Sequence, residues 1–287
     1  LFSNGNVFEE NDISIASFGS NYKNIELNLI NGMSYTRNTF INGKRAIHLE
    51  NTSPLFASYP STIIESMDEA GIYLLNTSAD LSEIMIDDSG DAGIVSNNST
   101  SSSVFFNISK SSLSNCGYGL LLNDYHFSEI GNSNVEDCSV GILAFDGLNA
   151  TTDIHNNTFD NNPTALVSFC NANTIGTIYD NEFTQNKNEV LLFGNGGKNE
   201  WATQYNVFDT HETLSSLTAT ITYNNINSGR IFKNNILSRD KRAINVTSGI
   251  FNTVVRNIMV DDLANSSELA ISVQNSDLNL IKCNEIY

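Results

Sequence analysis

Three aspartates in the segment Asp87-Asp88-Ser89-Gly90-Asp91 have the spacing of a glycine-containing turn that could bind calcium. Carboxylate oxygens are the ligands that Ca²⁺ prefers in proteins. We therefore name Asp87, Asp88 and Asp91 as candidate ligands of a Ca²⁺ ion, the one cofactor that the sequence suggests. The spacing differs from that of an EF-hand, and a solvated acidic turn is the alternative that the sequence favours.

Side chains that could catalyse a reaction are scattered along the chain. None of the four histidines stands in a recognisable hydrolase, phosphate-binding or zinc-protease motif. A cluster of opposite charges at residues 239–242, with Asp261 and Asp262 one repeat later, could supply the groups of a polysaccharide lyase. Such clusters more often form surface salt bridges. We therefore expect a protein without catalytic activity, with a polysaccharide lyase or a glycoside hydrolase as the alternative.

The elements that position these residues form an internal repeat. One unit has the form Φ-x-x-Asn-x-Φ, where Φ is apolar, as in residues 154–159, 178–183 and 232–237. A second unit, a small residue followed by Φ-x-Φ, usually begins six residues after the first, as at residues 165–168. The period is near 24 residues. Alternation with period 2 predicts strands, and units this short bury their apolar faces by stacking, which predicts a parallel β-solenoid.

Stacking places equivalent residues in columns. The second unit supplies an inward aliphatic column of Ile47, Ile72, Leu120, Ile142, Leu166, Ile244 and Ile271. The first unit supplies an aromatic column that includes Phe40, Phe159, Phe183 and Phe208. The chain contains 43 asparagines, and those of the first unit are expected to form a ladder of amides at a turn. The predicted members of this ladder are Asn134, Asn157, Asn181, Asn206, Asn235, Asn257 and Asn284.

Residues 156–162, followed by Ala165-Leu166-x-Ser168, resemble the parallel β-helix repeat of the pectin-lyase-like superfamily. The resemblance covers nearly the whole chain and implies an all-β fold, a right-handed single-stranded parallel β-helix. We expect one such domain over residues 1–287, with about eleven coils of ~24 residues. Neither end shows an amphipathic cap, so we expect a slice of a longer chain. The superfamily includes lyases, hydrolases, tailspikes and adhesins, so the resemblance does not select one function.

Two cysteines occupy equivalent places in successive coils, because Cys116 and Cys138 each precede the small residue of their unit by three positions. Stacked Cα atoms would be about 4.8 Å apart, within the usual disulfide range of about 4.4–6.8 Å. A coil-to-coil disulfide and a pair of buried thiols both remain open. No cysteine has the spacing of a zinc site.

The outward positions of the second unit are unusually apolar in the central coils. An exposed sheet face normally alternates apolar-in and polar-out. Here a contiguous apolar patch is expected, and such patches mark covered or binding surfaces. The alternatives are a loop of this chain lying over the patch, or an interface with another domain, a subunit or a ligand. The candidate binding residues are Tyr73, Leu121, Leu143, Phe145, Val167, Phe169 and Leu192.

Charge and composition limit the partners. Acidic residues outnumber basic residues 32 to 14, and the net charge of −18 disfavours nucleic acid and anionic membranes. No apolar run approaches the roughly 20 residues that span a bilayer. We expect a structural or adhesive segment, extracellular or on a bacterial cell surface, that binds a protein, other domains of the same polypeptide or a polysaccharide. A phage tail-fibre or tailspike-like domain is the second alternative.

Overall fold

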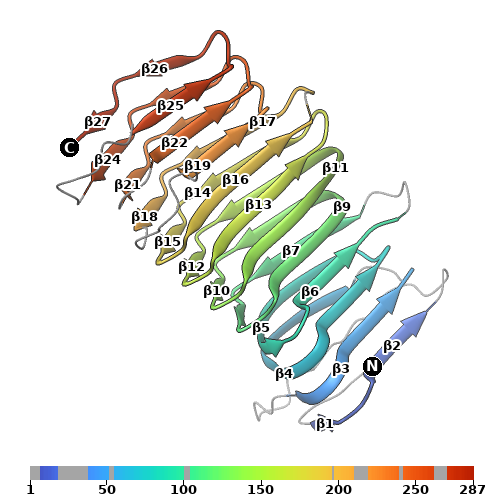
Figure 1. Ribbon diagram of the computed structural model, residues 1–287. Helices are drawn as coiled ribbons and strands as arrows, with labels where there is room; N and C mark the ends of the chain where they lie inside the picture. The colour runs from blue at the N-terminus through green and yellow to red at the C-terminus, as the bar shows by residue number, and fades with distance from the viewer. Residues whose placement is uncertain are drawn as a thin grey trace.

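The computed structural model describes residues 7–18, 38–51, 55–99, 104–195, 197–209, 219–238, 242–261 and 270–287. Over these ranges the chain forms 27 strands, paired in parallel, and no helix (Figure 1). The predicted parallel β-solenoid is therefore confirmed, with about nine turns where about eleven coils were expected. In the same ranges no helix is long and apolar enough to cross a membrane.

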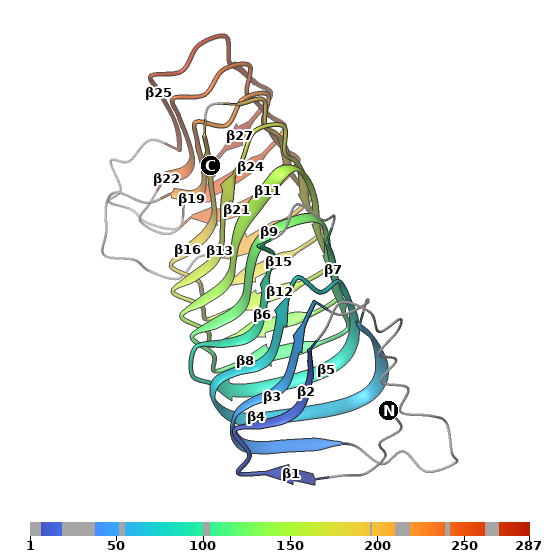
Figure 2. The ribbon, with the colours of Figure 1, turned by 90° about the vertical axis from the view of Figure 1, so that its right-hand side faces the viewer.

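Three sheets surround one elongated core (Figures 1 and 2). Five long strands bend around a corner and pair in more than one sheet: β3 (Thr39–Glu50), β4 (Leu55–Leu75), β5 (Ala79–Ser89), β9 (Tyr118–Gly131) and β11 (Val140–His155). The first sheet also contains β1 (Val7–Glu9), β8 (Ser112–Ser114), β10 (Asn134–Glu136), β12 (Thr158–Asp160), β15 (Glu182–Thr184), β18 (Val207–Asp209), β21 (Asn235–Ser238), β24 (Ile258–Asp261) and β27 (Glu285–Ile286).

The second and third sheets complete each coil. The second sheet also contains β2 (Ile13–Phe18), β6 (Ala92–Asn97), β13 (Thr164–Cys170), β16 (Asn188–Gly194), β19 (Ala219–Asn224), β22 (Arg242–Thr247) and β25 (Ile271–Gln274). The third sheet also contains β7 (Phe105–Ser109), β14 (Ile175–Tyr179), β17 (Glu200–Gln204), β20 (Arg230–Phe232), β23 (Thr253–Val255) and β26 (Leu280–Lys282).

The core consists of the predicted columns. The registers place Ile142 beside Leu120 and Leu166, all fully or almost fully buried, in the aliphatic column of the second sheet. In the first sheet the buried rings of Phe159 and Phe183 stack with centroids 4.9 Å apart, and Phe208 continues the stack at 4.7 Å. Stacking like on like buries the apolar side of every short strand, which no single coil could do alone.

The asparagine ladder lies at the corner between the third and first sheets. In the six coils from Asn157 to Asn284, the Oδ1 of the ladder asparagine accepts a hydrogen bond from the backbone N–H of the ladder residue one coil earlier, at 2.9–3.1 Å. Five predicted members are confirmed in the ladder: Asn157, Asn181, Asn206, Asn257 and Asn284. Asn134 and Asn235 were wrong, because the ladder residues of those coils are Ser133 and Asn234. Each pair is adjacent in sequence, so spacing alone placed the ladder one residue late there.

A left-handed backbone residue precedes each ladder position and turns the corner. Asn132, Asn156 and Asp180 have φ of 52°, 53° and 54°, and Lys233 has φ of 56°. Asparagine and aspartate tolerate this conformation better than most residues. The high asparagine content therefore serves two adjacent positions of the same corner, one that makes the turn and one that bonds to the next coil.

Candidate binding site

The predicted outward patch lies on the central strands of the second sheet. The registers place Leu121, Leu143 and Val167 in one column, and Phe145 beside Phe169 in the next. We define the apolar face as these residues together with Leu191 and Phe193, which continue the two columns in β16. The side chains of Phe145 and Phe169 are 40% and 42% exposed. The rings of Phe145, Phe169 and Phe193 stack at 5.0 and 5.3 Å, so the face presents a ridge of ring edges.

Leu192 does not belong to the apolar face, and its prediction as a binding residue was wrong. It is fully buried and pairs with Ser168, whereas Leu191 pairs with the outward Val167. The position that is small in other coils holds the buried Glu189 here. Without the small residue to mark the unit, the sequence placed the inward and outward positions one residue out of phase.

Tyr73 lies in the same column as Leu121 but is separated from it by Val95. Its ring packs against His48, with centroids 4.8 Å apart, and the Arg45 guanidinium lies 4.2 Å from its centroid. Arg45 also bonds to the Glu69 carboxylate at 2.8 Å. Tyr73 therefore lies in a charged cluster at one end of the sheet rather than in the apolar face.

The three aspartates of the predicted calcium loop do not form a shared metal site. The part of the chain that the structure describes, which includes all three aspartates, contains no group of three or more His, Cys, Asp or Glu that could hold a metal ion. The Asp87 carboxylate instead accepts hydrogen bonds from Ser114 Oγ at 2.8 Å and Asn115 Nδ2 at 2.7 Å, and Asp88 accepts one from Ser66 Oγ. These carboxylates therefore bond to neighbouring coils instead of sharing an ion.

An open groove of about 760 Å³ runs along the ladder corner, and its lining combines polar side chains with the exposed, apolar Met85. It crosses four successive coils, and its lining includes Glu83, Lys110, Asn132, Asn134, Asn156 and Thr158. The coil spacing of about 4.8 Å gives it a length of about 14 Å. Glu83 and Lys110 are its charged residues, and amides and hydroxyls supply most of its other polar groups. The groove can therefore offer many hydrogen bonds to a ligand with little net charge.

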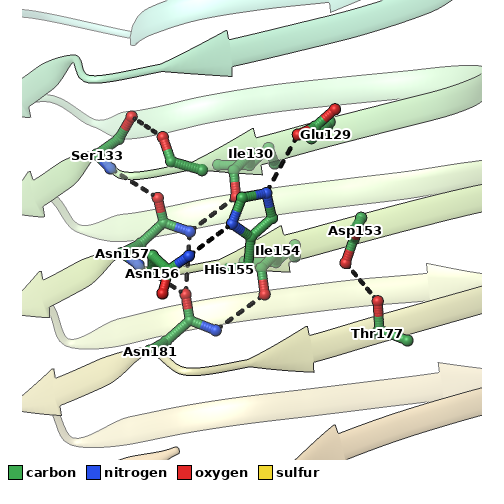
Figure 3. A network of polar contacts seen from close by, with 11 residues as sticks. Glu129, Ile130, Ser133, Asp153, Ile154, His155, Asn156, Asn157, Thr177 and Asn181 are labelled. Carbon is green, nitrogen blue, oxygen red and sulfur yellow. Dashed lines mark hydrogen bonds and ion pairs between the residues drawn. The ribbon is translucent and has the colours of Figure 1, made fainter.

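His155 is held at the edge of this groove by partners on both ring nitrogens (Figure 3). Asn156 Nδ2 donates to Nδ1 at 3.0 Å, which leaves the proton on Nε2 to donate to Glu129 Oε1 at 3.2 Å. The ring also stacks on Tyr179 with centroids 5.2 Å apart. A Cβ added to Gly131 would lie 2.6 Å from the imidazole, so the glycine makes room for the ring.

A buried polar cluster lies inside the solenoid, below the apolar face. Asp146 is 1% exposed and accepts a hydrogen bond from the Tyr125 hydroxyl, which also lies 3.2 Å from Thr152 Oγ1. Burial raises the pKa of Asp146 to about 6, although the hydrogen bond from Tyr125 favours the ionised form. No motif in the sequence marks this group, because Asp146 lies inside the long strand β11 among residues of ordinary strand type.

Cys116 and Cys138 lie in adjacent coils, as their equivalent places in the repeat predict. Of the two alternatives left open, the structure shows buried free thiols. Cys170 is also buried, and burial raises the pKa of its thiol. Cys283 is exposed. Of the charged cluster considered as a catalytic alternative, residues 239–241 and Asp262 lie outside the described residues.

The groove and the His155 contacts were missed by the sequence analysis. Their residues come from separate coils and share no motif. The sequence feature that they share is their place at the corner, next to the ladder residue of each coil. Asn132, Asn156 and Lys110 each precede a ladder residue, and a search of that position in successive coils would have brought them together.

Solved structures with a similar fold include two from Arthrobacter chlorophenolicus A6. The DFA-IIIase is 12% identical, with a TM-score of 0.41, and the match covers 88% of this chain and 66% of that one. The same enzyme without its lid, in complex with GF2, gives 12% identity and a TM-score of 0.46, over 90% and 68% of the two chains. The periplasmic alginate epimerase AlgG gives 11% identity and a TM-score of 0.48, over 88% and 77%.

No curated protein matches the chain. A family model does, and it is described as periplasmic copper-binding protein (NosD). The match covers residues 2–168, more than half of the 287 residues, and includes every residue that lines the groove and the coils that carry Cys116 and Cys138. Together with the parallel solenoid, this match shows that the chain belongs to the NosD family of β-helix proteins.

Proposed function

We propose that this chain is a non-catalytic, extracytoplasmic β-helix that binds an extended, largely uncharged glycan in the corner groove. The observation that carries the proposal is the groove itself, with hydroxyls and amides over four coils and one acid and one base among its lining. Sugar hydroxyls both donate and accept hydrogen bonds, as asparagine amides do. The family description as periplasmic supports the location outside the cytoplasm.

The surroundings of His155 support binding rather than catalysis. A general acid or base must reach the reacting proton with a free nitrogen. Both nitrogens of His155 already bond to Glu129 and Asn156 within the protein. The imidazole therefore fixes the Asn156 amide at the edge of the groove, where it stiffens the lining.

Replacing Asn134 with alanine is expected to weaken glycan binding about five- to tenfold, the effect of losing one or two hydrogen bonds. The measurement is retention of the protein on a panel of neutral and acidic polysaccharides, with release of new chain ends followed in parallel. Asn235→Ala is the matched control, because Asn235 occupies the same register position outside the groove. Equal retention of both variants, or cleavage of any polysaccharide, would contradict the proposal.

The apolar face favours a second candidate function, docking of a protein partner. Its exposed Phe145 and Phe169 form part of a stacked ridge rather than scattered surface residues. Because the rings present their edges, the face suits apolar side chains better than the flat face of a sugar.

A photo-crosslinking phenylalanine analogue at position 169 is expected to give a discrete adduct in the native cell envelope. The same analogue at position 251 is the control, because Phe251 is 54% exposed and lies far from the apolar face along the chain. Mass spectrometry of the adduct identifies the partner. Identical adduct patterns from the two positions would mean random collision and would rule out a specific docking face.

Copper is the metal named in the family description, and it binds sulfur and imidazole donors in proteins. Among the described residues no three- or four-ligand group of His, Cys, Asp and Glu exists. The soft donors that lie together are the stacked thiols of Cys116 and Cys138. Thiolate sulfur is the ligand type that copper(I) selects, and these two thiols lie in adjacent coils, but they fall short of the three donors of a metal-binding group.

A further inference from the structure

His155 and Asn156 are joined by a hydrogen bond whose direction depends on the protonation of the imidazole. Asn156 Nδ2 donates to His155 Nδ1 at 3.0 Å. On the other side of the ring the Glu129 carboxylate, which can only accept, lies 3.2 Å from Nε2, so Nε2 carries the proton. A neutral imidazole has one donor nitrogen and one acceptor nitrogen. The arrangement in Figure 3 therefore belongs to the neutral ring.

The imidazole has little freedom to turn. Its side chain is 12% exposed and lies between two residues that are in register with it, Gly131 in the preceding coil and Tyr179 in the next. The ring stacks on Tyr179, and a Cβ on Gly131 would meet its other face. A change in protonation must therefore be accommodated by the hydrogen-bond partners of the ring.

The Asn156 amide, in contrast, can turn. Asn156 is exposed, lies at the left-handed corner position and lines the groove. Its backbone N–H bonds to Tyr179 O at 3.3 Å, so the corner itself stays in place. Rotation about the bond to a terminal amide has a broad energy profile. A half-turn exchanges Oδ1 and Nδ2 with little change in the shape of the side chain.

The charged groups around the ring come from the three strands that meet there. Glu129 lies on β9, Asp153 on β11, and Asp180 directly follows β14. Burial and then the charges of Asp153, Glu129 and Asp180 raise the pKa of Tyr179, so all three carboxylates act on the place where the rings stack. A protonated His155 would keep its Nε2 bond to Glu129. The contact that must change is the one at Nδ1.

We propose that protonation of His155 reverses the Asn156 amide and so changes the hydrogen bonds that the corner groove offers. A proton from solvent binds Nδ1, and the imidazolium then donates from both nitrogens. An N–H that faces the Asn156 NH₂ group is repulsive, so the amide turns and Oδ1 accepts from Nδ1. The NH₂ group then points away from the ring, where Oδ1 pointed before. One lining position of the groove changes from acceptor to donor.

This change selects between two kinds of sugar substituent, and this part of the inference rests on the proposed glycan function. A sugar hydroxyl both donates and accepts, so it can bond to either face of the amide. A carboxylate or an acetamido carbonyl oxygen only accepts, so it bonds to the NH₂ group alone. We therefore expect the groove to gain affinity for glycans with acceptor substituents when His155 is protonated. His155 acts through Asn156 and is a positioning residue.

The first test needs no glycan. Nuclear magnetic resonance of the isotope-labelled full chain follows the His155 ring nitrogens and the Asn156 side-chain amide from about pH 8 to about pH 5. We expect the amide signals of Asn156 to shift with the same midpoint as the imidazole. Asn132 is the internal control, because it occupies the equivalent corner place one coil earlier but follows Gly131. In His155→Phe, which keeps a ring against Tyr179, the Asn156 amide is expected not to titrate.

The second test measures the affinity of two uncharged glycans with the same linkage, chitohexaose with acetamido groups and cellohexaose with hydroxyls. Between about pH 8 and about pH 5 we expect the affinity for chitohexaose to rise about tenfold relative to that for cellohexaose, the effect of one hydrogen bond gained. Because neither glycan is charged, attraction to the imidazolium does not contribute. His155→Phe is expected to bind both with a ratio that does not change with pH.

The two tests separate the possible failures. An Asn156 amide that does not follow the titration of His155 in the wild-type chain would overturn the inference, and this measurement needs no substitution. Binding of both glycans at a ratio independent of pH would also overturn it. An amide that titrates with His155 in a chain that binds neither glycan would support the reversal and contradict the proposed glycan function.

Discussion

Asn234→Ala is expected to lower the free energy of unfolding by about 3–5 kcal/mol. The Asn234 side chain is fully buried and accepts hydrogen bonds from the backbone N–H and Nδ2 of Asn206 at 3.1 and 3.0 Å. Its own Nδ2 donates to Thr203 O and to Asn257 Oδ1, both at 2.9 Å. Alanine would leave several buried groups of three coils without partners, and each such group costs about 1–3 kcal/mol.

Chemical denaturation gives the stability, and hydrogen exchange shows which coils open. Asn235→Ala is a strict control, since it removes the same side chain one residue later, where it is exposed on β21. We expect that variant to stay within about 0.5 kcal/mol of the wild type. Exchange should accelerate at Asn206 and Asn257 before it does so in distant coils, because solenoid coils contact mainly their neighbours. Equal losses from both variants would mean that the ladder bonds contribute nothing specific.

Asp146→Asn is expected to stabilise the protein by about 3 kcal/mol at about pH 8. Burial raises the pKa of Asp146 to about 6, so the folded carboxyl keeps its proton to a higher pH than the unfolded one does. The contribution of this group is therefore fully present below its ordinary pKa, decreases as the pH rises towards about 6, and is lost above it. Asparagine has no charge to bury and can still accept the hydrogen bond from Tyr125.

The measurement is the free energy of unfolding from about pH 3 to about pH 8, for the wild type, Asp146→Asn and Asp80→Asn. Asp80 is exposed, so its variant should follow the wild-type profile. The difference between wild type and Asp146→Asn should grow between about pH 4 and about pH 6 and then stay constant. A difference that does not depend on pH would mean that Asp146 has the same pKa in the folded and unfolded states, and that burial does not raise it.

The repeat predicts the architecture well because stacking is a property of the pattern, and each coil imposes its register on the next. Phe159, Phe183 and Phe208 are found where the spacing places them. Prediction failed where two residues compete for one position, as Asn234 and Asn235 do, and where an atypical residue hides the unit, as Glu189 does before Leu192. A shift of one residue in the assignment then places core side chains on the surface and surface side chains in the core.

The binding groove and the buried Asp146 could not be predicted in the same way. The groove depends on which side chains occupy one corner in four coils, and the repeat leaves those positions free to vary. The pKa of Asp146 depends on how completely its neighbours exclude water. The stacked cysteines lie between these cases, because the repeat predicts that they occupy adjacent coils whereas their burial as free thiols depends on the packing around them.

The ladder also sets how the rod bears mechanical load. Asn157 bonds back to Ile130 O at 2.8 Å and forward to Asn181 Oδ1 at 3.0 Å, so its side chain ties three coils together. Ser133 accepts from the Ser111 N–H at 3.1 Å but donates within its own coil, to Gly131 O, and so ties two. Because traction along the axis would load these bonds in series, we expect the serine-bearing coils to separate at lower force than the asparagine-bonded coils beyond Asn157.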